Sequence, residues 1–306
     1  MPEGELSRIF EEEVKWEFAS DSAGAELRPT LVIVGGQPGS GKTRTVLRAG
    51  DDYPGAAKVV GDDLRQYHPE YDSVMRADPL RMPEVTAQAA GAWVEMSLEY
   101  LRESQRSVIL ETTLRQPQVV ADTISTFRDA GYEVELRALA VPAALSRLGT
   151  LTRYTQQVAE QGAGRWTFRE YHDNAFANML DTVERVVAEG LVNRLLVITR
   201  SGVVLHDRRI NVLADTVFDG AEARRIIGAG REPATVPQES ARQWVEQFTA
   251  AVEVLVSHHV SDPDLLESTR LLVSESEGVV RAAHPHDLAA REEAERAVAQ
   301  GAARLP

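Results

Sequence analysis

The sequence has no cysteine among its 306 residues, and it has no long apolar run. The absence of cysteine excludes disulfides, thiolate metal sites and thiol nucleophiles, and it fits a reducing compartment. No stretch approaches the roughly 20 apolar residues that a membrane-spanning helix needs. The first 18 residues are rich in glutamate and lack the apolar core of a secretory signal. We therefore expect a cytoplasmic protein that has no membrane partner.

Basic residues are outnumbered by acidic ones. The chain carries 33 lysine and arginine residues against 47 aspartate and glutamate residues, which gives a formal net charge of -14. An acidic surface repels a phosphate backbone, so a nucleic-acid substrate is not expected. The length is enough for one large or two small domains, and a hydrophobic content of 43% is ordinary for a globular protein.

A phosphate-binding loop is the most informative motif. The pattern G-x-x-x-x-G-K-S/T is matched at every fixed position by the segment Gly36, Gln37, Pro38, Gly39, Ser40, Gly41, Lys42 and Thr43. An apolar run precedes this loop and a helix-forming segment follows it, as the strand–loop–helix context requires. In such a loop backbone N–H groups surround the phosphates, Lys42 reaches the terminal phosphates and the Thr43 hydroxyl holds Mg²⁺. We expect the chain to bind a nucleoside triphosphate.

Apolar segments alternate with helical segments through the first two thirds of the chain. The expected strands are Leu31–Val34, Lys58–Gly61, Val108–Thr112, Val134–Val141 and Leu195–Thr199. The expected helices between them are Lys42–Ala49, Glu84–Glu103, Gln118–Ala130, Ala143–Glu160 and Phe168–Glu189. This alternation predicts an α/β fold, with a parallel sheet of the P-loop NTPase type flanked by helices. Ser201-Gly202 predicts a hairpin turn that adds Val203–His206 to the sheet.

Helical patterns without strands mark both ends of the chain. An amphipathic helix is expected over residues 4–19, where Leu6, Phe10 and Val14 share one face. Near the other end, three helical segments over 239–258, 265–279 and from residue 287 onward predict a C-terminal helical appendage. We expect a P-loop domain over residues 1–232, with the first helix included, and a small helical extension over residues 233–306.

Polar side chains follow the second and third expected strands. Asp62 and Asp63 come after one strand, and Glu111 and Thr113 stand at the end of the other. Ligands bind at the carboxyl ends of the strands in open α/β sheets. A carboxylate there can take a proton from a substrate hydroxyl or hold a metal. Because side chains alternate along an extended segment, only one of the two aspartates is expected to face the phosphates.

Two arginines farther along the chain are candidates for the same site. Arg153 lies in an expected helix, and Arg165 follows a loop that contains two glycines. Guanidinium groups brought over the phosphates could neutralise charge in a transition state. An isolated arginine is more often a solvated surface residue, so neither is assigned on its own. Trp166 is expected to be a packing residue, and stacking on a nucleobase is the alternative.

The order of these motifs resembles the zeta-toxin family of kinases over roughly residues 28–210. Beside the phosphate-binding loop, the likeness is carried by Asp62 with His68-Pro69, Glu111-x-Thr113-x-Arg115, Ala140-Val141-Pro142, Leu148-Gly149-Thr150 before Arg153-Tyr154, and Arg165 with His172-Asp173. The phosphate-binding loop alone is generic, whereas the ordered set is specific to the family.

The resemblance implies a kinase that transfers the γ-phosphate of ATP or GTP, with Mg²⁺, to the 3′-hydroxyl of the sugar of UDP-N-acetylglucosamine. In the family this reaction depletes a peptidoglycan precursor and is toxic unless a small helical antitoxin blocks the nucleotide site. By position, the resemblance makes Asp62 the general base, and Lys42, Arg153 and Arg165 the groups that stabilise the transferred phosphoryl group. It places four residues in the sugar-nucleotide pocket, namely Glu95, Glu111, Thr113 and Arg115.

Alternatives stay open on the sequence. The family usually has glycine at the position of Thr112, so another acceptor alcohol, such as a nucleoside, an antibiotic or another sugar, is a second hypothesis. A nucleotide-binding regulatory module without turnover is a third. The helices of residues 233–306 lie outside the likeness: they are either a packing or dimerisation domain, or a segment that restrains the kinase in cis as an antitoxin would. The sequence does not choose between ATP and GTP, and it does not set the oligomeric state.

Overall fold

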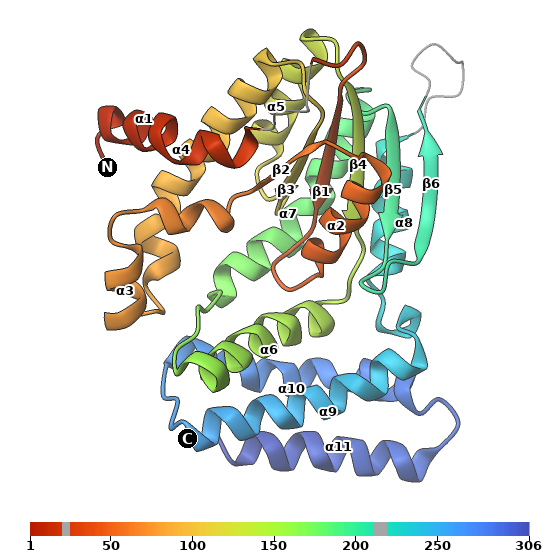
Figure 1. The fold of residues 1–306 in the computed structure, drawn as a ribbon. Coiled ribbons are helices and arrows are strands. Elements are labelled where there is room, and N and C mark those ends of the chain that lie inside the picture. Colours follow the sequence, from red (N-terminus) through yellow and green to blue (C-terminus); the bar gives the residue numbers. More distant parts are fainter. Residues whose placement is uncertain (20–24, 211–218, 306) are drawn as a thin grey trace.

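The computed structural model describes residues 1–19, 25–210 and 219–305. Its centre is a six-stranded sheet with the strand order β2-β3-β1-β4-β5-β6 (Figure 1). The strands are β1 (Thr30–Gly35), β2 (Ala57–Val60), β3 (Val108–Thr112), β4 (Glu133–Leu139), β5 (Arg194–Ile198) and β6 (Val204–Arg209). The first five strands are parallel, and β6 runs antiparallel to β5. The predicted parallel sheet is confirmed, and so is the hairpin strand at its edge.

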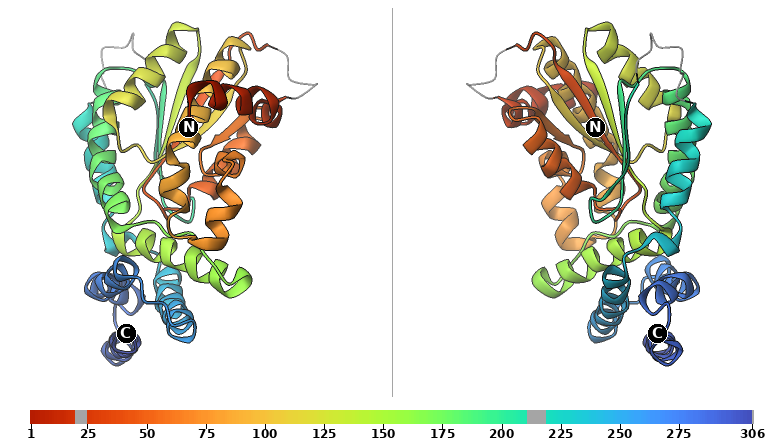
Figure 2. Two further views of the ribbon diagram at one scale, coloured as in Figure 1. Left: turned by 90° about the vertical axis from the view of Figure 1, so that its left-hand side faces the viewer. Right: turned by 90° about the vertical axis from the view of Figure 1, so that its right-hand side faces the viewer.

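Helices cover both faces of the sheet (Figure 2). They are α2 (Lys42–Asp52), α4 (Met82–Glu103), α5 (Pro117–Asp129), α6 (Ala143–Gln161), α7 (Arg169–Ala188) and α8 (Gly220–Gly230). Leu31 and Ile33 of β1 pack into one core with α4, α5 and α7, whereas Val32 and Val34 pack into the other with α2 and α6. Residues 31–34 of β1 are all apolar because both faces of this strand are buried. The five expected helices form with their ends shifted by a few residues, and α8 was not expected.

The N-terminal segment differs from its prediction as one continuous helix. It forms α1 (Glu3–Glu12) and then a 3-10 turn, η1 (Val14–Phe18), with a break at Glu13, where φ is -130°. A stripe repeated every four residues drifts by roughly 40° per repeat around a helix of 3.6 residues per turn. The break allows Leu6, Phe10 and Val14 to remain buried against the same core.

Three helices after residue 237 form the predicted extension. They are α9 (Gln238–Ser257), α10 (Pro263–Ala283) and α11 (Leu288–Ala303), and a 3-10 turn, η3 (Pro233–Thr235), leads into them. We call α9–α11 the C-terminal bundle. It packs on α6 through α9 and α10, on the side opposite the sheet (Figures 1 and 2). The side chains of Asp262 and Asp287 cap α10 and α11 by accepting bonds from Leu265 N and Ala290 N.

Two short elements between β2 and α4 were not expected from the sequence. They are η2 (Asp63–Tyr67) and α3 (Tyr71–Ala77), and they carry the chain from the end of β2 to the start of α4. Among the helices of the described residues, none is both long enough and apolar enough to cross a membrane.

Candidate active site

The phosphate-binding loop connects β1 to α2 and depends on two glycines. Gly39 and Gly41 have φ values of 74° and 97°, a left-handed conformation that side chains disfavour. A Cβ atom on Gly39 would also collide with the carbonyl oxygen of Ser146 on α6. The side chain of Gln37 is fully buried and donates to Val141 O at 2.9 Å and to Ser146 Oγ at 3.1 Å. The loop is therefore held from outside by α6.

Asp62, at the end of β2, lies among three guanidinium groups. Its carboxylate is 3.0 Å from Arg65 Nε, 3.3 Å from Arg165 Nη1 and 3.9 Å from Arg153 Nη1. Burial by itself raises the pKa of Asp62, but the positive charges of Arg165, Arg65 and Arg153 outweigh it and lower the pKa to about 2. Asp62 is thus an ionised carboxylate across the whole physiological range of pH. Its neighbour Asp63 is exposed.

Lys42 lies in the same cluster of charges. Its Nζ is 3.7 Å from Glu111 Oε1, at the end of β3, and it donates to Gln37 O at 3.3 Å. Burial lowers the pKa of Lys42, while the negative charges of Glu111 and Asp62 act against that shift. Burial raises the pKa of Glu111, and Lys42 opposes it. The structure thus brings the loop lysine, a strand-end glutamate and the Asp62 carboxylate into one electrostatic unit.

Arg153 and Arg165 reach this unit from α6 and from the segment that follows α6. Arg153 Nη2 donates to Thr167 Oγ1 at 2.7 Å, and the backbone N–H of Arg165 donates to Gln157 Oε1 at 3.0 Å. The Nε atoms of both arginines are buried without a hydrogen-bond partner in the described part of the chain. Buried donors of this kind suit an anionic ligand such as a phosphate group.

The loop after β3 is fixed in an unusual conformation. Leu114 is fully buried with a φ of 55°, and its carbonyl accepts a 2.6 Å hydrogen bond from Thr182 Oγ1 of α7. Its side chain fills the space beside Gly35, where a Cβ atom would overlap it. The hydroxyl of Thr112 accepts a bond from Leu114 N at 3.3 Å. The side chain of Thr112 therefore turns toward its own loop.

The residues predicted for the sugar-nucleotide pocket are not all brought together. Glu111 joins the charged cluster through its ion pair with Lys42. Thr113, two residues later, is half-buried. Arg115 is exposed and stacks over the ring of Tyr171, at 5.9 Å from the ring centroid. Glu95 is exposed on α4. In the regions of the chain that the structure describes, no hydrogen bond or ion pair connects Glu95 to the cluster.

Two residues that organise the site were not predicted from the sequence. Arg65 donates to Asp62 and, through Nη1, to Pro83 O and Thr86 Oγ1 at 2.8 Å each, which fixes it to α4. Thr167 holds Arg153. Arg65 stands three residues after Asp62, a spacing that places two side chains side by side in a helical turn, so the sequence carried a weak signal for it. No local pattern pointed to Thr167.

Comparisons with known proteins agree on one family. Residues 17–212 match the model of the Zeta toxin family. The chain is 29% identical over 206 residues to toxin zeta of Enterococcus hirae, a match that covers 67% of this chain and 70% of that protein. It is 27% identical over 186 residues to toxin PezT of Streptococcus pneumoniae, which covers 60% of this chain and 74% of PezT.

A solved structure also resembles this one. It comes from work on the PezAT chromosomal toxin–antitoxin system of Streptococcus pneumoniae, and it superposes with a TM-score of 0.65 over 83% of this chain and 98% of that chain. The sequence identity of that pair is 19%, so this likeness shows the fold alone.

Proposed function

The chain belongs to the zeta toxin family, and from this premise we propose that it is a P-loop kinase that phosphorylates the 3′-hydroxyl of the sugar in UDP-N-acetylglucosamine. The observation that carries the proposal is the position of Asp62, which pairs with Arg153 and Arg165 and shares a charged cluster with Lys42. A base, two phosphate-binding arginines and a loop lysine are the parts that transfer of a phosphoryl group to an alcohol requires.

The loop of residues 36–43 is proposed to hold the phosphates of ATP or GTP. Lys42 and the two arginines would face the transferred group, where positive charge stabilises the transition state. The Thr43 hydroxyl, in the first turn of α2, is an oxygen ligand of the kind that Mg²⁺ prefers, and it would hold the ion beside the phosphates. When bound, Mg²⁺ supplies charge neutralisation at the phosphates.

Asp62 is proposed as the general base. With its pKa lowered to about 2, it is ionised and able to accept a proton, but its basicity is weakened by the arginines. Those arginines would turn in part toward phosphoryl oxygens, and Asp62 would then lose stabilisation and become more basic. The rise in basicity would coincide with the alignment of the acceptor hydroxyl, which is when a base is needed.

A different acceptor alcohol is the second candidate. It was motivated by Thr112, because a side chain in place of glycine could narrow the pocket. In this structure the Thr112 hydroxyl bonds to Leu114 N instead. That orientation favours the acceptor of the family over a substitute. Glu111 and Thr113 are proposed to bind sugar hydroxyls, with Glu95 and Arg115 at the outer margin of the pocket.

The biological role proposed here follows from the names of the relatives, which are toxins, and from the toxin–antitoxin system to which the matched structure belongs. We propose that a separate small helical antitoxin restrains this kinase. We also propose that residues 1–232 form the kinase domain and residues 233–306 the extension.

The test is a phosphotransfer assay with the purified full chain. With ATP, Mg²⁺ and UDP-N-acetylglucosamine, mass spectrometry should detect a singly phosphorylated sugar nucleotide, and Asp62→Asn should reduce its formation by at least about a hundredfold. A panel of nucleosides and other sugar nucleotides tests the second candidate in the same assay. Absence of product from UDP-N-acetylglucosamine, or equal rates for wild type and Asp62→Asn, would refute the proposal.

A further inference from the structure

The side chains of the segment Arg165-Trp166-Thr167 point to two opposite sides. Arg165 pairs with Asp62, and Thr167 accepts the bond from Arg153, so both lie on the side of the charged cluster. Trp166, between them, turns to the opposite side and is 2% exposed. Its indole Nε1 donates to Asp264 Oδ2 at 2.8 Å, and Asp264 belongs to α10 of the C-terminal bundle. The segment that carries one arginine and holds the other is therefore anchored by the bundle.

The Asp264 carboxylate fixes a second point as well. The same Oδ2 atom accepts the backbone N–H of Arg169, the first residue of α7, at 3.1 Å. Trp166 also meets the ring of Tyr154 edge-on, with centroids 5.8 Å apart, and Tyr154 directly follows Arg153 on α6. One carboxylate of α10 thus sets the path of the chain between α6 and α7, where both arginines are positioned.

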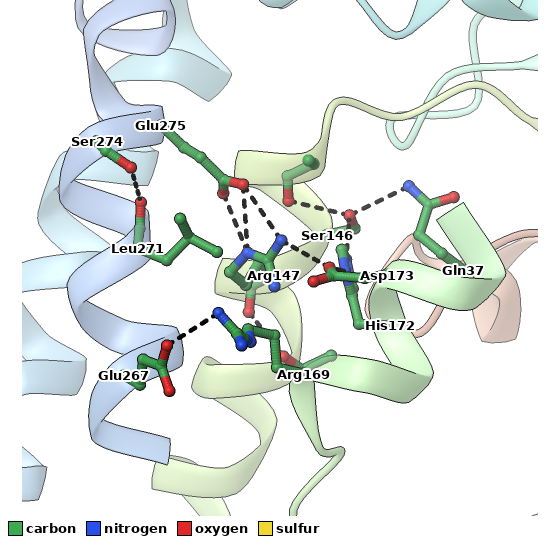
Figure 3. Close-up of polar contacts among 12 residues, drawn as sticks. Gln37, Ser146, Arg147, Arg169, His172, Asp173, Glu267, Leu271, Ser274 and Glu275 are labelled. Carbon is green, nitrogen blue, oxygen red and sulfur yellow. Dashed lines mark hydrogen bonds and ion pairs between the residues drawn. The ribbon is translucent and has the colours of Figure 1, made fainter. Parts of the chain in front are cut away.

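A second anchor joins α10 to the other end of α6. Glu275 accepts hydrogen bonds from Arg147 Nε at 3.1 Å and from its Nη2 at 3.2 Å, and Arg147 also donates to Asp173 Oδ1 of α7 at 2.9 Å (Figure 3). Arg147 is buried, so these carboxylates balance a charge that water does not reach. Its neighbour Ser146 contacts both His172 of α7 and Gln37 of the phosphate-binding loop (Figure 3).

The bundle itself stays away from the charged cluster. In the described ranges, no hydrogen bond or ion pair joins α9–α11 to residues 36–43 or to Asp62, and α6 lies between the bundle and the sheet (Figure 1). This arrangement gives no support to the hypothesis that the extension occludes the nucleotide site as an antitoxin would. The contacts of α10 with α6 and with residues 165–167 are therefore the route by which the bundle can affect the charged cluster.

We propose that the C-terminal bundle is a working part of the phosphotransfer site, with Asp264 as the positioning residue for the two phosphate-facing arginines. Glu275 is a second positioning residue, which holds the end of α6 next to the phosphate-binding loop. This inference rests on the proposed kinase function, because it assumes that Arg153 and Arg165 meet the terminal phosphate. It assigns a role to a region that lies beyond the family match at residues 17–212.

The test measures nucleotide binding, which needs no acceptor. Isothermal titration calorimetry gives the affinity of the full chain for ADP and for a non-hydrolysable ATP analogue, both with Mg²⁺. Because the arginines act on the terminal phosphate, the wild type should bind the triphosphate analogue more tightly than ADP. Asp264→Ala and Trp166→Phe should each reduce that preference by about five- to tenfold and leave ADP binding unchanged.

Three further variants separate positioning from folding. Asp264→Asn should restore most of the preference, because an amide oxygen still accepts the indole N–H. The double variant Asp264→Ala with Trp166→Phe should lose no more than Asp264→Ala alone, since that variant has already removed the acceptor of the indole N–H. Glu267→Ala, which removes an exposed pair with Arg169 on the same face of α10, should behave as wild type.

Several outcomes would overturn the inference. One is a preference for the triphosphate analogue that persists in Asp264→Ala and Trp166→Phe, and another is a loss of ADP affinity in these variants as large as their loss of affinity for the analogue. A third is a loss of preference in Glu267→Ala as large as that in Asp264→Ala. The last is a wild type that binds ADP and the analogue with the same affinity. A wild type that prefers the analogue but phosphorylates no UDP-N-acetylglucosamine would refute the proposed acceptor alone, and the binding series would still decide the role of Asp264.

Discussion

His172 Nε2 lies 2.9 Å from Ser146 Oγ, so a buried imidazole of α7 is joined to the helix that packs against the phosphate-binding loop. Its other nitrogen, Nδ1, lies 3.0 Å from Asp173 Oδ1. Burial, the largest cause, acts with the charges of Arg147 and Lys42 to lower the pKa of His172 to about 4, although Asp173 opposes the shift. The ring is therefore neutral in the folded protein at neutral pH.

This neutral histidine predicts an acid-sensitive fold. Between pH 6.5 and 4 the unfolded chain binds a proton at this position that the folded chain does not, so stability is complete above about pH 6.5 and falls as the pH drops through 4. The loss is on the order of 3 kcal/mol at most. Urea unfolding from pH 7 to pH 4 should show it, and His172→Gln should flatten the dependence. The exposed His286→Gln is the control, and a profile that His172→Gln leaves unchanged would contradict the assignment.

Arg165 should matter for the chemical step more than for nucleotide binding. Its guanidinium reaches Asp62 in the charged cluster and has a buried Nε without a partner in the described chain. Arg165→Ala should lower kcat by about 10²–10³-fold, as loss of a charge-stabilising donor does, with less than a threefold change in the Kd of ADP. Arg185→Ala, which removes a half-buried arginine paired with Glu189 on α7, is a matched control. A kcat within threefold of wild type would remove Arg165 from the proposed site.

Gly39 should not tolerate a side chain. Gly39→Ala combines the strain of a φ of 74° with a collision against Ser146 O, whereas Gly55→Ala has a φ of 89° and nothing within 4 Å of the new Cβ. Both variants should lose about 1 kcal/mol of stability from strain. Only Gly39→Ala should add a further loss of about 1–3 kcal/mol and weaken ADP binding by tenfold or more. Thermal unfolding and calorimetry measure the two effects, and equal behaviour of the variants would contradict this account.

Glu275 should contribute to stability through the buried Arg147. Glu275→Ala leaves that guanidinium with only one carboxylate partner, Asp173, and should cost about 2–3 kcal/mol in urea unfolding. Glu277→Ala, on the same helix, removes a solvent-exposed pair with Arg281 and should change stability by less than about 0.5 kcal/mol. Equal losses of stability in the two variants would show that Glu275 does not balance the buried charge of Arg147.

Much of the fold was predictable because local patterns of apolar and polar residues indicate it. The strand and helix segments from residue 31 onward have the spacing of their secondary structure, and the G-x-x-x-x-G-K-T loop has an obligatory place between strand and helix. The N-terminal break at Glu13 was not predictable, because it results from packing against α4 rather than from any residue that disfavours a helix. α8 was not predicted, because its buried positions, Gly220, Ala223, Ile227 and Gly230, recur at helical spacing but include only one large apolar side chain.

The site was predictable only where a strand end or a family motif marked it. Asp62, Glu111 and Lys42 stand at the carboxyl edge of a parallel sheet, so the topology itself places them near one another. The exposed positions of Glu95 and Arg115 could not be derived from spacing, because the direction of a side chain depends on how its helix or loop packs.

The sequence by itself determined that this chain forms a P-loop sheet with a phosphate-binding loop, because each of those features needs only contacts between neighbouring residues or a fixed order of strands. The tertiary structure decided what surrounds Asp62 and what the C-terminal helices do. The bond between Trp166 and Asp264 spans 98 positions, and that between Arg147 and Glu275 spans 128. Partners so far apart are chosen by the packing of α10 against α6 and α7, and no local pattern of residues encodes that choice.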